Sequence, residues 1–480
     1  MKLKDLLKGI KPLKIEGDIN IDVKDVAIDS NCVVNGSLFI CIKGGDFDGH
    51  SFCKTAEQYG AVAIICQRKV ETNLTQIMVE DTRIAMSVIA SNFYNNPEKE
   101  VKIIGVTGTN GKTTTVQLIS KILNDNGINC GTIGTLGIEY NQTHLPSNLT
   151  TPDPLVLFKT LRDMVNNGVR AVAMEVSAHA TYFNKIYGLF FEACVFTNLT
   201  QDHLDFFEDM DNYKKAKISL FDDKNLKYAV LNSDDKVSLE IANNVTNKLY
   251  YVIENPSDVF AIDVETTSNE THFVINLFDC IHVCKIKLTG LFNVYNTMAA
   301  ASVCALMGVD TKNIVKSLNK IEGISGRLES VYKGDYTVIV DYAHTPDGLE
   351  KCLLALKPIA KGKLICVFGC GGNRDSDKRS KMGEISGNIA DFTVITSDNP
   401  RFEEPMEIIW QIEKGVLSKT KNYVIVQDRE EAIRYAVQMA KKGDVILVAG
   451  KGSEQYQEVL GIKKPYNDKD TINDVIRGVL

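Results

Sequence analysis

The stretch that most constrains this chain runs from Lys102 to Thr115 and reads KIIGVTGTNGKTTT. Ile103, Ile104 and Val106 predict a short buried strand, and a helix is expected over about 113–126. The turn between them is rich in glycine, so backbone N–H groups can crowd around a phosphate beside the positive end of the helix dipole. Strand, glycine-rich turn and helix in this order predict an α/β fold with a phosphate site at the turn.

The polar side chains of this turn support the same interpretation. Lys112 supplies a point charge for β- and γ-phosphates, and Thr113 supplies a hydroxyl for Mg²⁺. The spacing is not G-x-x-x-x-G-K-T, because Val106 stands where the first glycine belongs. An ordinary glycine-rich turn is the alternative, which the lysine and the paired threonines disfavour. The candidate nucleotide-binding residues here are Gly108, Thr109, Asn110, Gly111, Lys112, Thr113 and Thr114.

The length of the chain predicts several domains, since 480 residues exceed what one core supports. Residues 1–98 predict a small α/β domain that ends near an Asn-Asn-Pro turn. In residues 99–326 strand and helix signals alternate, which predicts a mainly parallel sheet with helices on both faces, plus a hairpin-like antiparallel patch at 249–289. Residues 327–480 predict a Rossmann-like α/β domain without a G-x-G-x-x-G fingerprint, which disfavours a dinucleotide cofactor.

Individual elements are expected within the second and third domains. The expected strands are 101–106, 129–133, 171–176, 191–197, 227–232, 336–340, 363–368, 391–396, 423–427 and 444–449, and the expected helices of the second domain are 113–126, 154–167, 211–221, 235–243 and 293–307.

Composition argues against several classes of protein. The net charge of −7 gives no basic footprint for nucleic acid, and no apolar run is long enough to predict stable membrane insertion. The N-terminus lacks the apolar core of a signal peptide. Twelve cysteines occur without a C-x-x-C spacing, and the pairs Cys280/Cys284 and Cys366/Cys370 are expected to be buried free thiols. A reducing cytoplasm fits these features.

Three acids and two bases in the second domain are candidates for chemistry. Glu175 ends the strand-like run AVAMEV, where a carboxylate can bind nucleotide-associated Mg²⁺; an exposed strand-end acid is the alternative. Asp202, His203 and Asp205 follow the next strand, and their spacing favours a metal site over a structural histidine. Lys217 is expected on the apolar face of a helix, where burial favours the neutral, nucleophilic amine.

The third domain carries four polar or glycine-rich strand ends, which together predict a ligand rim. They read DYAHTPDGLE, GCGGNRD, SDNPRFEEP and VAGKGSEQYQ. The second and third carry Arg374 and Arg401, and two arginines on one rim suggest bidentate recognition of carboxylate or phosphate.

Taken together, these motifs resemble the Mur ligase family over the whole chain. The matching segments are TGTNGKTTT, LTTPD, MEVSAH, NLTQDHLD, YKKAK, GLFNVYN, SGRLE, DYAHTPD, GCGGNRD, DNPR and AGKGSE. The resemblance implies an ATP-dependent ligase that adds meso-2,6-diaminopimelate to UDP-N-acetylmuramoyl-L-alanyl-D-glutamate through an acyl phosphate, in cytoplasmic peptidoglycan precursor synthesis. A paralogue that adds L-lysine, or that uses another acceptor, is the alternative.

The resemblance also implies roles for single residues. Lys112, Glu175, His203 and Lys217 match catalytic positions, with Thr113, Glu175, His203 and a carbamate on Lys217 as ligands of two Mg²⁺ ions. ATP-facing positions outside the glycine-rich turn are Asn293, Asn296, Arg327, Asp341 and His344. Positions facing the UDP-sugar-dipeptide are Ser30, Thr150, Thr151, Ser177 and Lys185. The amino-acid pocket matches Arg374, Asp398, Asn399, Pro400, Arg401, Gly450 and Glu454.

The chain departs from the family's pattern at several positions. Asn31 and Lys185 each stand in place of an arginine, Leu149 in place of an asparagine, and Ser453 in place of a histidine. Three of these four face the UDP-sugar-dipeptide, and the phosphate turn is unaffected. A GTPase would need an N-K-x-D motif, and the nearest segment, NKIE at 319–322, fails. A folate-polyglutamylating relative should lack DNPR, and a non-catalytic relative should have lost the phosphate and metal residues.

Overall fold

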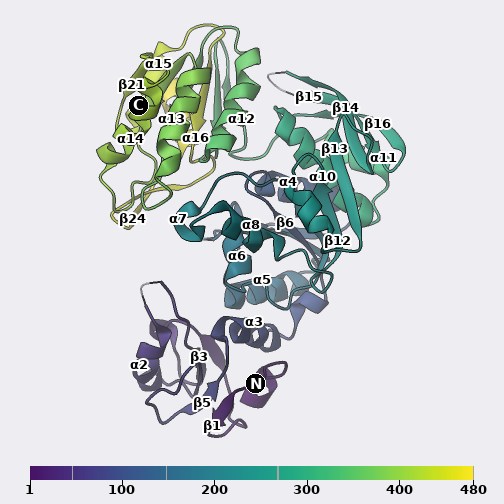
Figure 1. Ribbon diagram of the computed structural model, residues 1–480, viewed down its shortest axis with the longest axis vertical. Coiled ribbons are helices and arrows are strands. Elements are labelled where there is room, and N and C mark those ends of the chain that lie inside the picture. The colour runs from purple at the N-terminus through teal and green to yellow at the C-terminus, as the bar shows by residue number, and fades with distance from the viewer. Residues whose placement is uncertain (46, 148, 268–269, 479–480) are drawn as a thin grey trace.

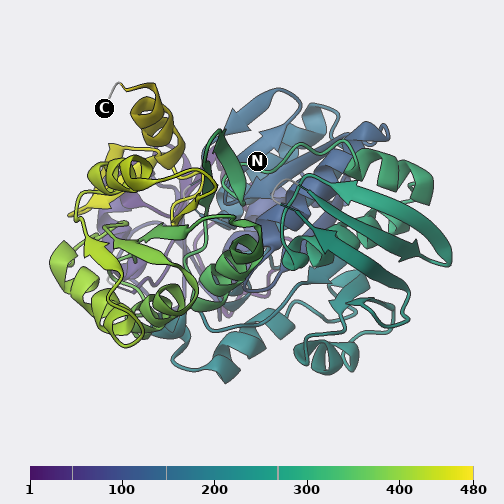
Figure 2. The same ribbon diagram turned by 90° about the horizontal axis from the view of Figure 1, so that it is seen from above.

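The computed structural model describes residues 1–45, 47–147, 149–267 and 270–478. The described chain forms three α/β domains, each built on its own sheet (Figure 1). The first domain, coloured purple, occupies one end of the long axis, and the central domain lies between it and the green-to-yellow C-terminal domain. Seen from above, the C-terminal and central domains stand side by side (Figure 2). The expected three-domain α/β fold is confirmed.

The first domain is a five-stranded sheet in the order β1-β5-β4-β3-β2. Only β1 runs antiparallel to its neighbour, and the buried runs of β3 and β4 give the sheet its core. The strands are β1 (Lys14–Glu16), β2 (Asp25–Ala27), β3 (Ser37–Ile40), β4 (Ala63–Cys66) and β5 (Thr75–Met78), and the helices are α1 (Leu3–Leu6), η1 (Ser30–Cys32), η2 (Gly49–Phe52), α2 (Cys53–Gln58), α3 (Thr82–Phe93) and η3 (Pro97–Lys99).

The central domain is built on an eleven-stranded sheet in the order β16-β15-β14-β13-β12-β11-β6-β10-β7-β8-β9. The strands from β14 to β7 are parallel, so their carboxyl ends share one edge. The strands are β6 (Lys102–Thr107), β7 (Cys130–Gly134), β8 (Gly137–Tyr140), β9 (Thr143–Leu145), β10 (Ala171–Glu175), β11 (Phe191–Phe196), β12 (Leu226–Asn232), β13 (Lys248–Ile253), β14 (Val259–Thr266), β15 (Thr271–Leu277) and β16 (Cys280–Ile286).

Helices cover both faces of the central sheet, as the alternation of signals predicted. α4 and α10 pack together on one face, and the small residues Ala299, Ala300 and Ala301 of α10 are fully buried in the core that the two helices share. The helices are α4 (Lys112–Asp125), α5 (Pro154–Asn166), α6 (Ala178–Tyr182), α7 (Leu204–Phe207), α8 (Met210–Ile218), α9 (Val237–Ala242), α10 (Leu291–Leu306) and α11 (Thr311–Leu318).

The C-terminal domain has a six-stranded sheet in the order β17-β18-β22-β19-β20-β21, parallel except for β17. A separate hairpin, β23–β24, follows the last parallel strand. The strands are β17 (Glu329–Lys333), β18 (Thr337–Asp341), β19 (Leu364–Phe368), β20 (Phe392–Ile395), β21 (Tyr423–Ile425), β22 (Val445–Ala449), β23 (Tyr456–Val459) and β24 (Ile462–Pro465), and the helices are α12 (Pro346–Leu356), η4 (Lys357–Ile359), α13 (Asp377–Ile389), α14 (Pro405–Leu417), α15 (Arg429–Met439) and α16 (Asp468–Arg477).

Two details of the sequence prediction are wrong. The patch at 249–289 is not a hairpin throughout, because β13 pairs in parallel with both β12 and β14 and only β14, β15 and β16 are antiparallel. Cys280 is exposed rather than buried, because it is the first residue of β16 and directly follows the tight turn at Phe278 and Asp279, away from the core. All twelve cysteines are free, as expected. The predicted boundaries at 98/99 and 326/327 fall between the sheets.

Within the described part of the chain, no helix combines the length and apolar character needed to cross a bilayer.

A buried ion pair ties the last helix, α16, to α15. Arg429 donates through Nε and Nη2 to the two carboxylate oxygens of Asp468, at 2.7 and 2.8 Å, and both side chains are almost fully buried. Removing one partner of such a pair leaves an unpaired buried charge, which typically costs about 3–5 kcal/mol.

Asp468→Asn is therefore expected to lower the denaturant midpoint of the C-terminal domain substantially, as followed by circular dichroism. Asp22→Asn removes an exposed ion pair with Lys2, which solvent screens, and should leave the unfolding midpoint almost unchanged. Equal shifts in the two variants would contradict the importance of the buried pair.

Candidate functional site

A cavity of about 1140 Å³ opens where the carboxyl ends of the central strands face the C-terminal domain. It brings together all three groups of predicted site residues. The predicted residues that line it are Thr109, Asn110, Gly111, Lys112, Thr113, Thr114, Thr150, Thr151, Glu175, Ser177, Lys185, His203, Lys217, Asn296, Arg327, Asp341, His344, Arg374, Asp398, Asn399, Arg401, Gly450 and Glu454. Four predicted residues do not line it: Ser30, Gly108, Asn293 and Pro400.

The glycine-rich turn is held by the two residues that directly follow the neighbouring strand β11. Thr109 N–H donates to the carbonyl of Asn198, and Thr197 Oγ1 donates to the carbonyl of Asn110 at 2.6 Å. Gly111 caps α4 with a φ of 90°, and a Cβ there would lie 2.4 Å from Asn296 Oδ1. The turn therefore needs glycine both for its backbone conformation and for the close approach of α10.

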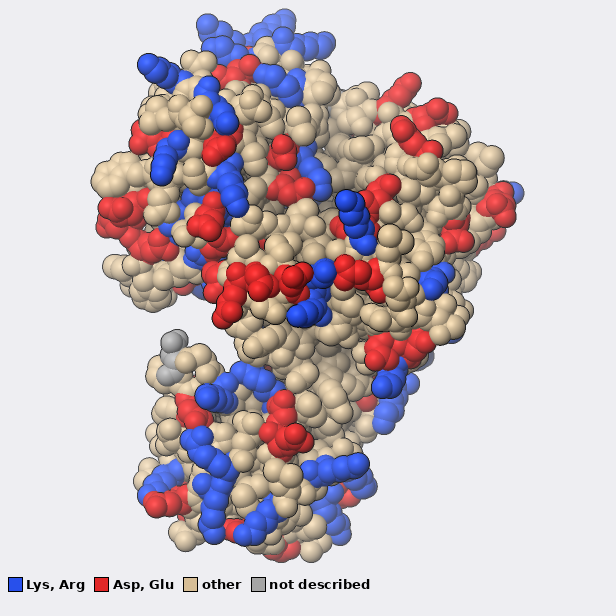
Figure 3. Space-filling model, in the orientation of Figure 1, with Lys and Arg blue, Asp and Glu red and all other residues tan. Residues whose placement is uncertain are grey.

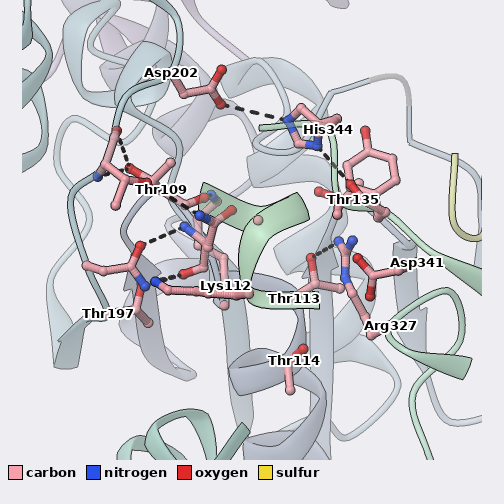
Figure 4. A pocket seen from close by; sticks show the side chains of 18 of the residues that line it. Thr109, Lys112, Thr113, Thr114, Thr135, Thr197, Asp202, Arg327, Asp341 and His344 are labelled. Carbon is pink, nitrogen blue, oxygen red and sulfur yellow. Dashed lines mark hydrogen bonds and ion pairs between the residues drawn. The ribbon is translucent and has the colours of Figure 1, made fainter. Parts of the chain in front are cut away.

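Lys112 folds back over this turn (Figure 4). Its Nζ donates to the carbonyls of Gly108 and Thr109 at 2.9 and 2.8 Å. Burial lowers the pKa of Lys112, while Glu175 acts in the opposite direction. The ammonium lies among carbonyl groups at the N-terminus of α4, where an anionic ligand would find both charge and N–H donors.

Glu175 is buried, so the alternative of an exposed strand-end acid is excluded. Its Oε1 accepts hydrogen bonds from Thr113 Oγ1 at 2.9 Å and from the backbone N–H of Thr135 at 2.8 Å. Arg327, from the start of the C-terminal domain, donates to the same Thr113 hydroxyl at 2.7 Å (Figure 4). The guanidinium of Arg327 also lies 4.6 Å from the ring centre of Tyr342. Carboxylate, hydroxyl and guanidinium thus meet at the first turn of α4.

Lys217 is fully buried on the apolar face of α8, as its spacing predicted, whereas Lys215 is exposed. Its Nζ donates to the carbonyl of Gly108 at 2.8 Å and lies 4.6 Å from the ring centre of Tyr213. Burial, with the nearby Lys112 ammonium, holds the pKa of Lys217 well below its usual range. Two lysines converge on one carbonyl, and burial disfavours the charged form of both.

Asp202, His203 and Asp205 do not form the predicted metal cluster. Among the residues the structure describes, no group of three or more His, Cys, Asp or Glu side chains is arranged to hold a metal ion. The carboxylate of Asp202 instead faces three nitrogen atoms, 3.4 Å from His203 Nε2, 3.8 Å from His344 Nε2 and 3.7 Å from Lys378 Nζ, the last two in the C-terminal domain. The short spacing of the three residues failed as a signal because His203 adopts a left-handed backbone, with φ 56°.

Burial and neighbouring charged groups set the pKa values of Asp202 and His203. Burial by itself would raise the pKa of Asp202, but His344, His203 and Lys378 together hold the pKa well below its usual range. Burial lowers the pKa of His203 to about 3, against the pull of Asp202. His203 is therefore neutral near pH 7, and its imidazole keeps a lone pair for a ligand.

The residues expected to face the UDP-sugar-dipeptide extend the cavity away from the glycine-rich turn. Thr151 Oγ1 donates to the carbonyl of Glu175 at 2.8 Å, and Ser177 caps α6. Lys185 is nearly buried and pairs with Asp153 at 2.8 Å, and Leu149 lines the same wall. Ser30 lies apart from these residues, in the first domain.

The expected amino-acid residues form the C-terminal wall. Arg401 has a left-handed backbone, with φ 52°, and its Nη1 donates to the carbonyl of Gly372 at 2.7 Å. Its Nε lies 3.4 Å from a carboxylate oxygen of Glu458, on the β23–β24 hairpin. Asn399 donates through Nδ2 to Glu454 at 2.9 Å. Arg401 is thus aimed by contacts from two segments, the loop at Gly372 and the β23–β24 hairpin.

Several residues of the site had no signal in the sequence. Thr135 and Thr197, which directly follow β7 and β11, support Glu175 and the turn, and Lys378 reaches Asp202 from α13. Their contacts join positions tens to hundreds of residues apart, and none belongs to a short spacing pattern. Only the assumption that strand ends gather at one edge could have pointed to them.

These features define a class of protein: a three-domain α/β enzyme whose phosphate-binding turn faces a charged pocket in the C-terminal domain. Three family profiles match the chain, described as "Mur ligase family, catalytic domain" over residues 22–111, "Mur ligase middle domain" over 106–304 and "Mur ligase, glutamate ligase domain" over 326–452.

Similar proteins span the full chain. It is 43% identical over 484 residues to a protein of Clostridium acetobutylicum named UDP-N-acetylmuramoyl-L-alanyl-D-glutamate--2,6-diaminopimelate ligase 1, with 99% of each chain covered. A Geobacillus thermodenitrificans ligase of the corresponding name is 42% identical, with 95% of each covered. A solved structure of a 2,6-diaminopimelate ligase matches with a TM-score of 0.71 at 29% identity, covering 100% of this chain and 99% of the other. The chain belongs to the Mur ligase family, whose members are ATP-dependent ligases.

The fit between Gly111 and Asn296 gives a test of the turn. Gly111→Ala should weaken ATP binding by about tenfold or more, because overpacking of this kind typically costs about 1–3 kcal/mol and displaces the turn itself. Gly127→Ala is the matched control, since Gly127 also has a positive φ but no atom lies within 4 Å of its added Cβ. Calorimetric titration with ATP measures both, and similar affinities would contradict the close approach.

Proposed function

We propose that this enzyme adds meso-2,6-diaminopimelate to UDP-N-acetylmuramoyl-L-alanyl-D-glutamate, with ATP as the energy source, in the synthesis of the peptidoglycan precursor. The observation that carries the proposal is one cavity lined both by the phosphate-binding turn of the central domain and by the Asp398–Arg401 segment of the C-terminal domain. A ligase needs that arrangement, because the activated carboxylate and the incoming amine must meet while water is excluded.

The proposal assigns one substrate to each domain. Residues 1–98 with Ser30 take the UDP end, residues 99–326 take ATP and the dipeptide, and residues 327–480 take the amino acid. The full-length similarity to ligases named for these substrates supports the assignment. Asn110 Nδ2 donates to Asp347 at 2.7 Å, so the nucleotide turn already contacts the domain proposed to deliver the amine.

The side chains that line the cavity can support both chemical steps of the ligation. The dipeptide carboxylate attacks the γ-phosphorus of ATP, and an acyl phosphate and ADP result; the amine then displaces phosphate and forms the amide. Lys112 and the N–H groups at the start of α4 offset repulsion between the anions.

Arg327 bridges the two domains at Thr113, where it can hold the nucleotide against α4. Thr150, Thr151, Ser177 and Lys185 orient the dipeptide toward that point, and Asn293 supports Asn296 from behind with a 3.1 Å hydrogen bond.

The donor atoms of the site fit magnesium. Thr113 and Glu175 present a hydroxyl and a buried carboxylate within 2.9 Å of each other, and Mg²⁺ prefers few protein oxygens together with substrate phosphates. We assign Thr113 and Glu175 to one ion, and His203 with a carbamylated Lys217 to the second. When bound, the ions neutralise charge that develops on the transferred phosphoryl group.

The proposal of a carbamate on Lys217 is based on the surroundings of this side chain. Carbon dioxide adds only to a neutral amine, and burial beside the Lys112 ammonium favours that form of Lys217. The product is an anion, which would turn the repulsion between the two lysines into attraction.

Lys217→Ala is expected to abolish ligation, and added short-chain carboxylates should restore part of it by replacing the carbamate oxygens. Lys215→Ala, on the exposed side of the same helix, serves as control and should keep full activity. Product formation is read by mass spectrometry. Full activity of Lys217→Ala in carbonate-free buffer would contradict the carbamate.

The choice of amino acid rests on Arg401 and its neighbours. meso-Diaminopimelate carries a distal carboxylate that a guanidinium can bind, whereas lysine places an ammonium there and would be repelled. Arg374 lines the same wall and can take a second carboxylate, while Glu454 offers an anion for an ammonium. Gly450 allows this wall to close, since a Cβ there would lie 2.5 Å from Asp398 Oδ2.

The test is a competition between meso-diaminopimelate and L-lysine at equal concentration, with UDP-N-acetylmuramoyl-L-alanyl-D-glutamate and ATP, read by product mass. The unmodified enzyme should form the diaminopimelate product, and Arg401→Ala should lose about ten- to a hundredfold of that preference, the worth of a hydrogen bond to a charged group. Arg477→Ala, exposed at the end of α16, should keep the preference. Lysine as the main product of the unmodified enzyme would overturn the proposal.

We also place the enzyme in the cytoplasm. The proposed reaction consumes ATP, and all twelve cysteines are free in the structure, which is the state expected in a reducing compartment.

A further inference from the structure

We propose that Lys451, a residue that does not itself line the cavity, is the positioning residue that sets the amino-acid pocket's charge and orients two of its members. The inference rests on the proposed function and goes beyond it by assigning a role to a buried cation behind the pocket wall.

The position of Lys451 follows from the turn after β22. Gly450 and Gly452 both adopt positive φ, at 114° and 53°, and turn the chain so that Lys451 lies beneath the surface. Lys451 has no exposed surface, and its Nζ lies 5.7 Å from the ring centre of Tyr456 and 6.0 Å from that of Tyr466. A lysine is rarely fully buried unless it is paired, so its partners determine why it is there.

Those partners are pocket residues. Lys451 Nζ donates to Glu454 Oε2 at 2.5 Å and to Asn399 Oδ1 at 3.0 Å. Asp398 Oδ1 lies 3.9 Å away. All three partners line the cavity, whereas Lys451 does not. One buried ammonium therefore contacts three residues of the wall from behind.

The contact with Asn399 fixes which way its amide faces. Its Oδ1 accepts from Lys451 Nζ and from the backbone N–H of Glu458, and its Nδ2 donates to Glu454. A flipped amide would place two donors against the ammonium and the N–H, and an acceptor against a carboxylate. Lys451 thereby locks Asn399 and, through it, the carboxylate of Glu454.

The same ammonium sets the charge that a ligand meets. Asp398 and Glu454 contribute two negative charges beside the cavity, and Lys451 neutralises one of them. The remaining negative charge matches a single ammonium, such as one of the two on the incoming amino acid. Because Glu454 Oε2 is taken by Lys451 and Asn399, its other oxygen is the one left for that ligand.

The test is a double-mutant cycle with Lys451→Met, Glu454→Gln and the pair, measured as the KM for meso-diaminopimelate with ATP and UDP-N-acetylmuramoyl-L-alanyl-D-glutamate saturating. Lys451→Met should raise this KM about tenfold or more, as expected for loss of a hydrogen bond to a charged group, and leave the KM for ATP within about twofold. The double variant should resemble the worse single variant, because both changes remove the same interaction. Lys361→Met, exposed on the same domain, should change neither KM.

An unchanged KM for the amino acid in Lys451→Met, or multiplicative effects in the double variant, would overturn the proposal. If Lys451→Met does not fold, Glu454→Gln is compared with the double variant, in which the charge is balanced; equal KM values support the proposal and a further rise overturns it. The unmodified enzyme tests the proposed function separately. If it joins L-lysine instead, the proposed function fails, and the cycle is run with L-lysine.

Discussion

The whole site depends on how closely the turn after β6 is held against its neighbours. Thr197 and Asn198, which directly follow β11, bond the backbone of the turn, and Asn296 of α10 approaches Gly111 so closely that a side chain there would clash. A backbone held on both sides fixes the position of the N-terminus of α4, where an anion can bind without reorganisation.

Burial then gives the lysines around this turn their chemical character. Lys112 and Lys217 approach one carbonyl, that of Gly108, from two helices, and burial lowers the pKa of both. Their surroundings differ. Lys112 is partly exposed in the cavity near Glu175, whereas Lys217 is buried beside the ring of Tyr213. The proposed roles, a cation for Lys112 and a nucleophilic amine for Lys217, rest on this difference in surroundings.

The C-terminal domain completes the site with side chains that reach across the domain boundary. Arg327, His344, Asp347 and Lys378 contact Thr113, Asp202 and Asn110 of the central domain. On the outer surface, a notch separates the C-terminal domain from the first, and acidic side chains cross the face over α7 and α8 (Figure 3). Buried positive groups therefore lie behind a negative surface, which places the attraction for anionic substrates inside the cavity.

The sequence by itself determined the α/β class, the strand-turn-helix at 102–126 and the burial of Lys217, because these depend on local periodicity and on glycine. The sequence also predicted that the polar strand ends lie close together, since parallel strands bring their carboxyl ends to one edge of the sheet. Only the tertiary structure decided that Asp202 faces the C-terminal domain instead of a metal cluster with His203 and Asp205, that β13 pairs in parallel, and that Lys451 lies behind Glu454. Those outcomes depend on backbone direction at single residues and on contacts between distant segments, which residue spacing does not encode.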